Sequence, residues 1–308
     1  MSFIAGAGLA NCDILFSGMP RVPTEGEEIY ASGLDIQMGG GVPATMITLH
    51  RLGVPVHLST FLGTDYFSEV VGKELLKSGI PYTNLHEGNG MPVTATCAII
   101  TKKDRTFVSY RDKAPVTDQL LETIYQQSKG AKIVEMHIGY LDVYKKLKED
   151  HVTLLMDTGW EDDLSLEKYA DYIELADFYT PSYKEALKIT GTTTSDAAIN
   201  VLSHYFKAPI VKLSRDGCMV MENGKTSVVA PMPHEAVDAT GAGDAFLAGL
   251  MYGLFYDYSI SDSVLFGNIT GGACVKGIGC LTSYVNEQEL LKTAENITNR
   301  SFKRSVSL

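Results

Sequence analysis

The chain of 308 residues is long enough for one large α/β domain, and its 45% hydrophobic and 20% charged residues exclude a disordered or fibrous protein. Its 37 acidic and 26 basic residues give a formal net charge of −11, which argues against nucleic acid or an anionic membrane as a partner, because both bind clustered Lys and Arg. The five cysteines form no CxxC pair, so neither a disulfide framework nor a zinc site is expected. The start is apolar without a basic segment, and no run reaches roughly 20 apolar residues, so we expect a cytoplasmic protein.

Short β-branched runs alternate with amphipathic, helix-like stretches along most of the chain, which is typical of a parallel sheet with helices on both faces. In chain order, strands are predicted at residues 3–7, 56–61, 133–137, 153–157, 178–180 and 210–213. Helices are predicted at residues 44–52, 68–77, 117–128, 182–190, 197–206 and 242–252. The fold class indicated by this pattern is α/β.

Two segments break this alternation and predict a small second layer over one end of the sheet. Residues 13–36 are rich in turn formers and polar residues, and residues 94–110 alternate in polarity around a charged tip, which predicts a β-hairpin. Both segments lie beside sheet strands in the sequence. We therefore expect one domain over residues 1–308, with a lid formed by residues 13–36 and 94–111.

The stretch AVDATGAGDAFLAGLMYGL, residues 236–254, carries the strongest chemical signal. Gly241, Ala242 and Gly243 have little or no side chain, so the backbone can approach a ligand closely, and an apolar run at helical spacing follows. Free amides at a helix start form an anion site. Asp244 lies in the first turn, where it is either a partner of the helix dipole or a base that takes a proton from an attacking hydroxyl.

The run Asp238-Ala-Thr240-Gly241-Ala242-Gly243-Asp244 closely resembles the D-T-G-A-G-D signature of the ribokinase/PfkB family of carbohydrate and nucleoside kinases. The resemblance implies a ribokinase-like three-layer α/β/α sandwich with a small β lid. It also implies that Asp244 is the catalytic base and that residues 241–244 form the anion hole for the transferred phosphate. Asp238 and Thr240 would lie near a monovalent cation, usually K⁺, that orders the hole.

A second match lies far from the first, in Gly39-Gly40-Gly41-Val42-Pro43-Ala44-Thr45. It resembles the family's N-terminal signature, in which a diglycine turn, here Gly40-Gly41, meets the substrate and opens a helix. A glycine run alone is more often just a tight turn, but the two signatures occur here in the family's order. Thr45 stands where most relatives place a substrate-binding Asn, and it keeps a hydroxyl but lacks the amide.

Upstream, Asn11 and Asp13 stand where relatives use an N-x-D pair at the end of the first strand to bind sugar hydroxyls. The alternative for Asp13 is a turn-capping Asp. Tyr110-Arg111 follows the hairpin and resembles a pair that reaches the substrate in relatives that phosphorylate fructose or keto-deoxy sugar acids. The forked donors of Arg suit a carboxylate, although an Arg at a strand end is more often solvated surface.

Three further segments resemble the nucleotide side of the family's site. Thr180-Pro181-Ser182-Tyr183-Lys184-Glu185 resembles the N-x-x-E element, in which Glu185 would organise Mg²⁺ through water; Ser182 replaces the usual Asn, and a Ser182/Glu185 capping box is a sufficient alternative. The run at residues 212–217 resembles the V-x-L-G-x-x-G loop, for which a strand-end turn is the alternative. The nucleotide-binding residues implied in all are Lys212, Ser214, Gly217, Asn268 and Gly277.

Other enzyme classes fit the sequence less well. The G-x-G-x-x-G at residues 6–11 lacks its third glycine, where Asn11 stands, and the NGKT run at residues 223–226 has Met219 where a P-loop needs its first glycine. The histidines form no H-E-x-x-H pattern, and no G-x-S-x-G elbow is present. An NAD enzyme, a P-loop kinase, a zinc enzyme and an α/β-hydrolase are therefore disfavoured.

The sequence thus predicts a phosphotransferase with an alcohol group as acceptor, a carbohydrate kinase that uses Mg²⁺, ATP and K⁺. The expected acceptor is a free ketose, aldose or sugar acid, because GGGVPAT lacks the Lys that several sugar-phosphate kinases carry. Two alternatives remain open: a nucleoside kinase of the same family, and a regulator that binds nucleotide or sugar without turnover. Asp244 favours an enzyme, since a regulator needs no carboxylate aimed at the phosphate. Relatives often form homodimers through their lids, and the hairpin face is a candidate contact.

Overall fold

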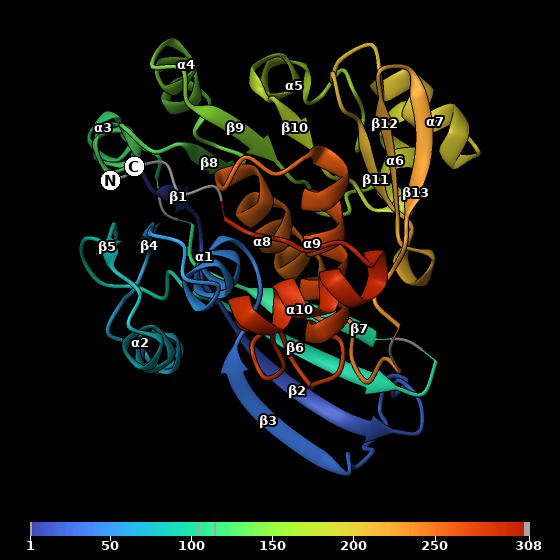
Figure 1. Ribbon diagram of the computed structural model, residues 1–308. Helices are drawn as coiled ribbons and strands as arrows, with labels where there is room; N and C mark the ends of the chain where they lie inside the picture. The colour runs from blue at the N-terminus through green and yellow to red at the C-terminus, as the bar shows by residue number, and fades with distance from the viewer. Residues whose placement is uncertain (1, 104, 114, 234, 305–308) are drawn as a thin grey trace.

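A parallel sheet of six strands forms the middle layer of the protein in the computed structural model, which describes residues 2–304 except 104, 114 and 234 (Figure 1). The strand order is β10-β9-β8-β1-β4-β5. The strands are β1 (Ile4–Ala7), β4 (Val56–Thr60), β5 (Tyr82–Asn84), β8 (Ile133–Met136), β9 (Thr153–Met156) and β10 (Phe178–Tyr179). The carboxyl ends of all six strands therefore lie at one edge of the sheet.

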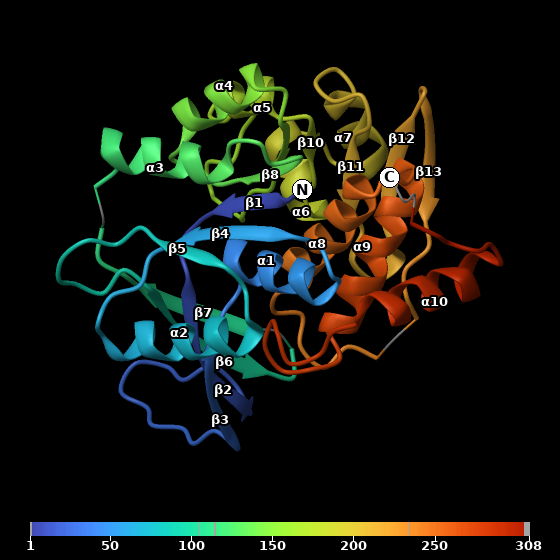
Figure 2. The same cartoon turned by 60° about the vertical axis from the view of Figure 1, so that its left-hand side comes forward.

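Helices cover both faces of this sheet (Figure 2). They bury two separate hydrophobic clusters against it. One face carries α1 (Val42–Arg51), α2 (Tyr66–Ser78), α8 (Ala242–Phe255), α9 (Ile260–Cys274) and α10 (Glu287–Thr298). The other carries α3 (Asp118–Ser128), α4 (Leu141–Glu149), α5 (Ala170–Leu175), α6 (Tyr183–Thr190) and α7 (Ser195–Leu202). Successive residues of a strand face opposite clusters, as Ile133 and Val134 do. This is the three-layer α/β/α arrangement that the sequence predicted.

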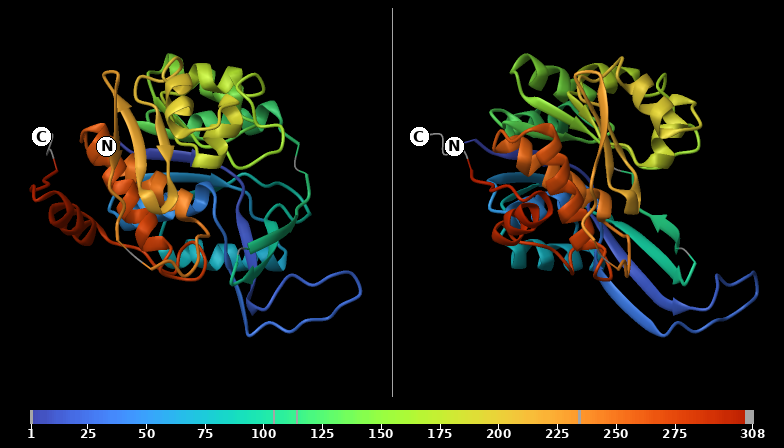
Figure 3. Two further views of the ribbon diagram at one scale, coloured as in Figure 1. Left: turned by 90° about the vertical axis from the view of Figure 1, so that its right-hand side faces the viewer. Right: turned by 45° about the vertical axis from the view of Figure 1, so that its right-hand side comes forward.

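A separate four-stranded sheet lies at one side of the sandwich, and its β2–β3 connection extends well away from it (Figure 3). It comprises β2 (Asn11–Met19), β3 (Gly33–Met38), β6 (Thr94–Thr101) and β7 (Arg105–Tyr110), in the order β3-β2-β6-β7. Strands β6 and β7 pair antiparallel, as the predicted hairpin requires, and β2 joins them by a parallel pairing with β6. We call these four strands the lid sheet.

A third sheet departs from the sequence expectation. Residues 210–213 were predicted as a strand of the central parallel sheet, but β11 (Ile210–Lys212) pairs antiparallel with β12 (Cys218–Glu222), which pairs in turn with β13 (Lys225–Val229). A short 3₁₀ turn at Ser214–Asp216 joins β11 to β12. A parallel bridge between Ser182 and Lys212, in which Lys212 N–H donates to Pro181 O at 2.9 Å, joins this sheet to the sandwich, and α6, α7 and α9 pack against its strands. The pattern of a buried apolar strand is the same in either sheet, so the sequence could not separate the two.

Helix α8 runs through the middle of its layer and is buried on almost all sides, because it packs between α1 and α9. Its first residue therefore has a fixed place at the carboxyl edge of the central sheet. Among the helices that the structure describes, none is both long and apolar enough to cross a membrane.

Candidate active site

The first turn of α8 is open to a ligand because no side chain caps it. Gly241 is the N-cap residue and has φ of +75°, a left-handed conformation that L side chains rarely adopt. A Cβ atom added there would lie 2.1 Å from Cys280 Cβ, so only glycine fits. The Ala242 N–H donates to Ala239 O at 3.3 Å, so the amides at the start of α8 that remain for an external acceptor, as an anion hole requires, are those of Gly243 and Asp244.

Asp244 brings the start of α8 against the diglycine turn before α1. A Cβ atom added at Gly40 would lie 2.3 Å from Asp244 Oδ2, and the Gly41 N–H donates to the same carboxylate. Burial raises the pKa of Asp244, while the Gly41 hydrogen bond and the Lys212 charge act in the opposite direction. Two signatures that lie about two hundred residues apart in the sequence thus share one contact.

Asp13 and Asn11 hold the other side of this turn. Asp13 is 5% exposed, and a Cβ atom added at Gly39 would lie 2.4 Å from its Oδ1. Asn11 Nδ2 donates to Gly40 O at 3.0 Å. Burial, with smaller contributions from Asp244 and Asp238, raises the pKa of Asp13 to about 6. The structure therefore brings together the two ends of the predicted substrate site.

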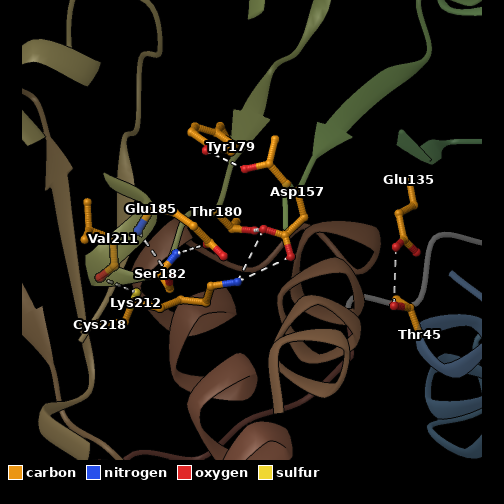
Figure 4. Close-up of polar contacts among 11 residues, drawn as sticks. Thr45, Glu135, Asp157, Tyr179, Thr180, Ser182, Glu185, Val211, Lys212 and Cys218 are labelled. Carbon is orange, nitrogen blue, oxygen red and sulfur yellow. Dashed lines mark hydrogen bonds and ion pairs between the residues drawn. The ribbon is translucent and has the colours of Figure 1, made fainter. Parts of the chain in front are cut away.

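Thr45 makes a polar contact that the sequence did not anticipate. It is completely buried, and its hydroxyl donates to Glu135 Oε1 at 3.4 Å (Figure 4). Glu135 is 5% exposed, and among the described residues its Oε2 has no hydrogen-bond partner. Burial, together with the charges of Asp244 and Asp157, raises the pKa of Glu135 well above its ordinary value. The sequence signal for Glu135 was a single acidic residue inside the apolar strand β8.

Asp157 and Lys212 form an ion pair at the carboxyl ends of β9 and β11 (Figure 4). Lys212 Nζ lies 3.3 Å from each of the two Asp157 oxygens, and Thr180 Oγ1 donates to Asp157 Oδ1 at 3.2 Å. Burial raises the pKa of Asp157 to about 6 although the Lys212 charge lowers it. Asp157 is the last residue of the predicted strand at residues 153–157 and directly follows β9, a position common for site residues in parallel sheets, but no role for it was predicted from the sequence.

Glu185 takes part in a complete capping box at the start of α6. Ser182 N–H donates to Glu185 Oε2 at 2.7 Å, and Ser182 Oγ accepts from Glu185 N–H at 3.4 Å. The capping role offered as the alternative is therefore present. One oxygen of Glu185 is engaged with the backbone, which leaves contact with a metal through water as the remaining way for it to act.

Asp238 closes a loop beside the start of α8. Its Oδ1 accepts from Thr240 N–H at 3.0 Å and from Thr240 Oγ1 at 2.8 Å, and its Oδ2 accepts from Gly279 N–H at 2.9 Å. The carboxylate is 6% exposed. It joins the segment before α8 to the segment after α9, and the single bond to Oδ2 leaves that oxygen with a lone pair for a cation. Within the described ranges, no group of three or more His, Cys, Asp or Glu side chains is arranged to hold a metal.

The other predicted nucleotide residues gather around β13 and the end of α9. Asn268 Nδ2 donates to Val229 O and Ala230 O at 3.0 and 2.9 Å. Gly217 has φ of +89°, and a Cβ atom there would lie 2.2 Å from Val229 O. Ser214 begins the 3₁₀ turn with φ of +55°, and Gly277 packs against Thr282. Asn268 and Gly217 thus meet at the same strand end, whereas the Lys212 side chain points away toward Asp157.

Tyr110 and Arg111 lie where the lid sheet returns to the sandwich. Tyr110 is 63% exposed and donates its hydroxyl to Asp112 Oδ1 at 3.0 Å. Arg111 lies close enough to His137 and Tyr140 for its charge to help lower the pKa of His137, which burial lowers first. His137 follows β8 and stacks on Tyr140 with 5.4 Å between ring centroids. Arg111 therefore reaches the edge of the central sheet, and Tyr110 faces solvent.

A model of the pfkB family of carbohydrate kinases matches residues 16–287. The chain belongs to this family. The membership predicted from the two signatures is thereby confirmed. The structure of Arabidopsis thaliana ribokinase complexed with ribose and ATP has a TM-score of 0.79 to this kinase-family chain at 22% identity, covering 96% of this chain and 99% of the other, so the ribokinase-like fold is shared.

Two relatives show how similar this chain is to individual kinases, one at full length and one over a short segment. The ribokinase of Haemophilus influenzae is 22% identical over 305 residues, which cover 94% of this chain and 97% of that protein. The inositol 3-kinase of Oryza sativa subsp. japonica is 40% identical over 95 residues, which cover 31% of this chain and only 23% of the rice protein. This pfkB family member is thus similar at full length to one sugar kinase and over a short segment to a cyclitol kinase.

Proposed function

We propose that the protein transfers the γ-phosphate of ATP to a hydroxyl of a small carbohydrate, with Asp244 as the general base. The observation that carries this proposal is the contact between the Asp244 carboxylate and the Gly40-Gly41 turn at the open start of α8. A hydroxyl bound at the turn would lie within reach of a carboxylate and beside the amides of residues 241–244. The acceptor, the base and the anion hole would then lie together in one site, as the proposed reaction requires.

The environment of Asp244 suits a general base. Burial moves its pKa upward, toward the pH at which a base both accepts a proton readily and is largely ionised. The Gly41 N–H limits this rise and fixes the orientation of the carboxylate. Asp244 takes the hydroxyl proton while the oxygen forms its bond to the γ-phosphorus, and the amides of the first turn of α8 bind the charge on the phosphoryl oxygens.

The acceptor side of the site favours a neutral polyol. Asp13 lies against Gly39 and can accept from sugar hydroxyls, and Asp244 and Glu135 add further acidic groups near the turn. The turn sequence GGGVPAT supplies no Lys or Arg, so an anion would meet mainly carboxyl groups there. A free ketose or aldose leads, a cyclitol is supported by the rice relative, and a sugar acid would depend on Arg111 from the lid sheet.

Carboxylates at the edge of the sheet fit the metal that ATP chemistry uses. Mg²⁺ prefers oxygen ligands and usually keeps several waters, and Glu185 offers it, through water, the carboxylate oxygen that the capping box leaves unengaged. When bound, Mg²⁺ would shield the charge of the ATP phosphates. The Asp238 and Thr240 loop suits a monovalent cation such as K⁺, because its carboxylate oxygens lie directly beside the start of α8.

The lid sheet is a candidate contact for a second copy of the chain. The strand register places Leu34, Ile36 and Val108 on one face of the sheet, with 69% of Val108 exposed, whereas Phe107 lies on the opposite face. Isolated apolar side chains are ordinary, but a row of them on a sheet favours pairing. Light scattering should give twice the chain mass for the native protein and a lower mass after Val108→Lys.

The proposed function is tested by ADP release from Mg²⁺-ATP and K⁺ over a panel of free sugars, cyclitols, sugar acids, sugar phosphates and nucleosides. Asp244→Asn, run alongside, should keep the fold and reduce turnover by about two to four orders of magnitude, the scale of general-base removal. Turnover confined to nucleosides would replace the sugar by a nucleoside. ATP binding with no turnover on any acceptor would favour a non-catalytic regulator.

A further inference from the structure

Lys212 was expected to belong to the nucleotide loop, but its side chain leaves that loop. It extends from the end of β11 across to Asp157, and Nζ stands 3.3 Å from both carboxylate oxygens (Figure 4). The side chain is 15% exposed, and that of Asp157 is 23% exposed. The pair therefore lies just inside the surface at the carboxyl edge of the sheet, accessible to a small ligand.

The same ammonium stands beside the open start of α8. A Cβ atom added at Gly243 would lie 3.7 Å from Lys212 Nζ, and Nζ is 5.8 Å from the centre of the Phe246 ring. The Lys212 ammonium, paired with Asp157, therefore lies next to the backbone amides of the proposed anion hole.

The carboxylates around the start of α8 explain why a bound phosphoryl group needs a cation there. Asp244, Asp157 and Glu185 all act electrostatically on Lys212, and each would repel a γ-phosphoryl group that arrives at the start of α8. Charge in phosphoryl transfer spreads over the three non-bridging oxygens, and helix amides stabilise it only partly. A full positive charge in a partly water-excluded site contributes much more than it would in bulk water.

We propose that Lys212 is a catalytic residue that binds a non-bridging oxygen of the γ-phosphoryl group, an assignment that rests on the proposed kinase function. The bond from the acceptor oxygen to the γ-phosphorus forms as the bond to the β,γ-bridging oxygen breaks, and the electron pair leaves with ADP. The hydroxyl proton goes to Asp244. Lys212 transfers no proton and stabilises charge throughout the step.

Asp157 has a defined part in this arrangement. In the structure it accepts from Lys212 and from Thr180, so it holds the ammonium beside α8 before a phosphate arrives. The 3.3 Å separations are long for a charged hydrogen bond. A phosphoryl oxygen can therefore compete for the ammonium without breaking a tight contact. Asp157 is accordingly a positioning residue for Lys212.

A comparison of two nucleotides separates this role from general nucleotide binding. Only a triphosphate carries the group that Lys212 binds, so Lys212→Gln should weaken a non-hydrolysable Mg²⁺-ATP analogue by about 10- to 100-fold, the scale of a hydrogen bond to a charged group. Its affinity for Mg²⁺-ADP, measured by calorimetry, should change by less than about twofold. Turnover should fall about 10²- to 10³-fold, as when one oxyanion donor is removed, with the acceptor KM unchanged.

Lys132 provides a matched control. It is also a lysine in an ion pair beside α8, but at the opposite end, where Nζ donates to Phe255 O at 2.8 Å and to Asp257 at 2.7 Å. Lys132→Gln should leave the affinity for both nucleotides and the turnover unchanged. A loss of analogue binding in Lys132→Gln comparable to that in Lys212→Gln would show that any lysine beside α8 acts through helix stability.

Lys212→Gln leaves Asp157 without its ion-pair partner and can therefore fold poorly. Two further variants test the assignment in that case. Lys212→Arg keeps the charge and should retain most of the selectivity for the triphosphate, while Lys212→Gln with Asp157→Asn removes both charges and should lose it. Equal losses for analogue and ADP, or unchanged turnover in Lys212→Gln, would overturn the proposal. The nucleotide comparison needs no acceptor, so a selective loss in a protein inactive on the whole panel would retain the Lys212 contact and reject the proposed kinase function instead.

Discussion

Helices α6 and α8 start at the same edge of the sandwich, but their N-termini are capped differently. Helix α6 begins at Ser182, and Ser182 and Glu185 satisfy each other's backbone amides in a capping box. Helix α8 begins at Gly241, which has no side chain to offer and is held in a left-handed conformation against Cys280. A capped start stabilises its own helix, whereas an uncapped one keeps its amides for a ligand. This contrast supports the proposal that the start of α8, and not that of α6, receives the phosphate.

The largest loss of stability and activity is expected from a side chain added at Gly241, the uncapped start of α8. Gly241→Ala should destabilise the protein by roughly 2–5 kcal/mol, since a left-handed alanine costs about 1–2 kcal/mol and overpacking against Cys280 adds about 1–3. Any folded fraction should lack kinase activity, because the amides of α8 must move. Denaturant unfolding and ADP release measure the two effects.

The C-cap of α6 supplies the control for that variant. Gly191 has φ of +66°, and a Cβ atom there would meet no described atom within 4 Å. Gly191→Ala should therefore show only the conformational cost, about 1–2 kcal/mol, with turnover preserved. Equal losses of stability in the two variants would contradict the close contact at Cys280.

The carboxyl groups around the open start should make substrate binding depend on pH. The pKa of Asp13 is raised to about 6, so its acceptor carboxylate is lost as the pH falls through 6. The acceptor KM should then rise by up to about tenfold per pH unit below 6. Asp13→Asn should give a high KM that does not change over the same range. A steep acid limb that persists in the KM of Asp13→Asn would assign it to another group.

Glu135 should make stability depend on pH in the opposite sense to an ordinary salt-bridged carboxylate. Its pKa is raised in the folded protein, so the folded state binds the proton more tightly than the unfolded state, and stability falls as the pH rises above about 4.5. Glu135→Gln removes this loss and should raise the midpoint of thermal unfolding more at pH 8 than at pH 5. Glu167→Gln, an exposed control, should leave the pH dependence as it is. If Glu135→Gln were no more stable than the native protein at pH 8, the Glu135 carboxylate would be ionised there and fully hydrogen-bonded in the folded state.

The smallest effect is expected at the capped start. Ser182→Ala should cost about 1 kcal/mol of unfolding free energy, the usual loss for a removed N-cap, with turnover changed by less than about threefold. Asn286→Ala removes the corresponding cap of α10, which has the same capping box far from the site, and should cost a similar amount. A large loss of turnover in Ser182→Ala alone would assign α6 a direct part in catalysis.

Most of the secondary structure followed from local patterns. The predicted strands at residues 3–7, 56–61 and 153–157 differ from β1, β4 and β9 by one residue at most at each end, because alternating burial is a property of neighbouring residues. Helix α9 was not among the helices predicted from periodicity, although the run around Asn268 resembles a helix of the family. It is buried on nearly every side and contains several glycines, so it has no amphipathic pattern that would distinguish it from a loop or strand.

The residues of the candidate site also fall into those that local sequence patterns predict and those that they do not. The glycines and Asp244 at the start of α8, and the Ser182/Glu185 box, are readable from spacing alone because a helix start is a relation among residues three or four positions apart. Glu135 and Asp157 gave no comparable signal. A single acidic residue at a strand end becomes informative only when its neighbours in the sheet and the helices above it are known.

By itself, the sequence determined many of the segments that form strands and helices, the position of an open helix start, and the membership of a kinase family. Only the tertiary structure decided that Asp244 meets the Gly40-Gly41 turn, that β11 joins a separate sheet, and that Lys212 crosses from its loop to Asp157 beside α8. The reason is physical: propensities and caps act over one turn of chain, whereas these contacts join distant segments and exist only once the central sheet and its helices have packed.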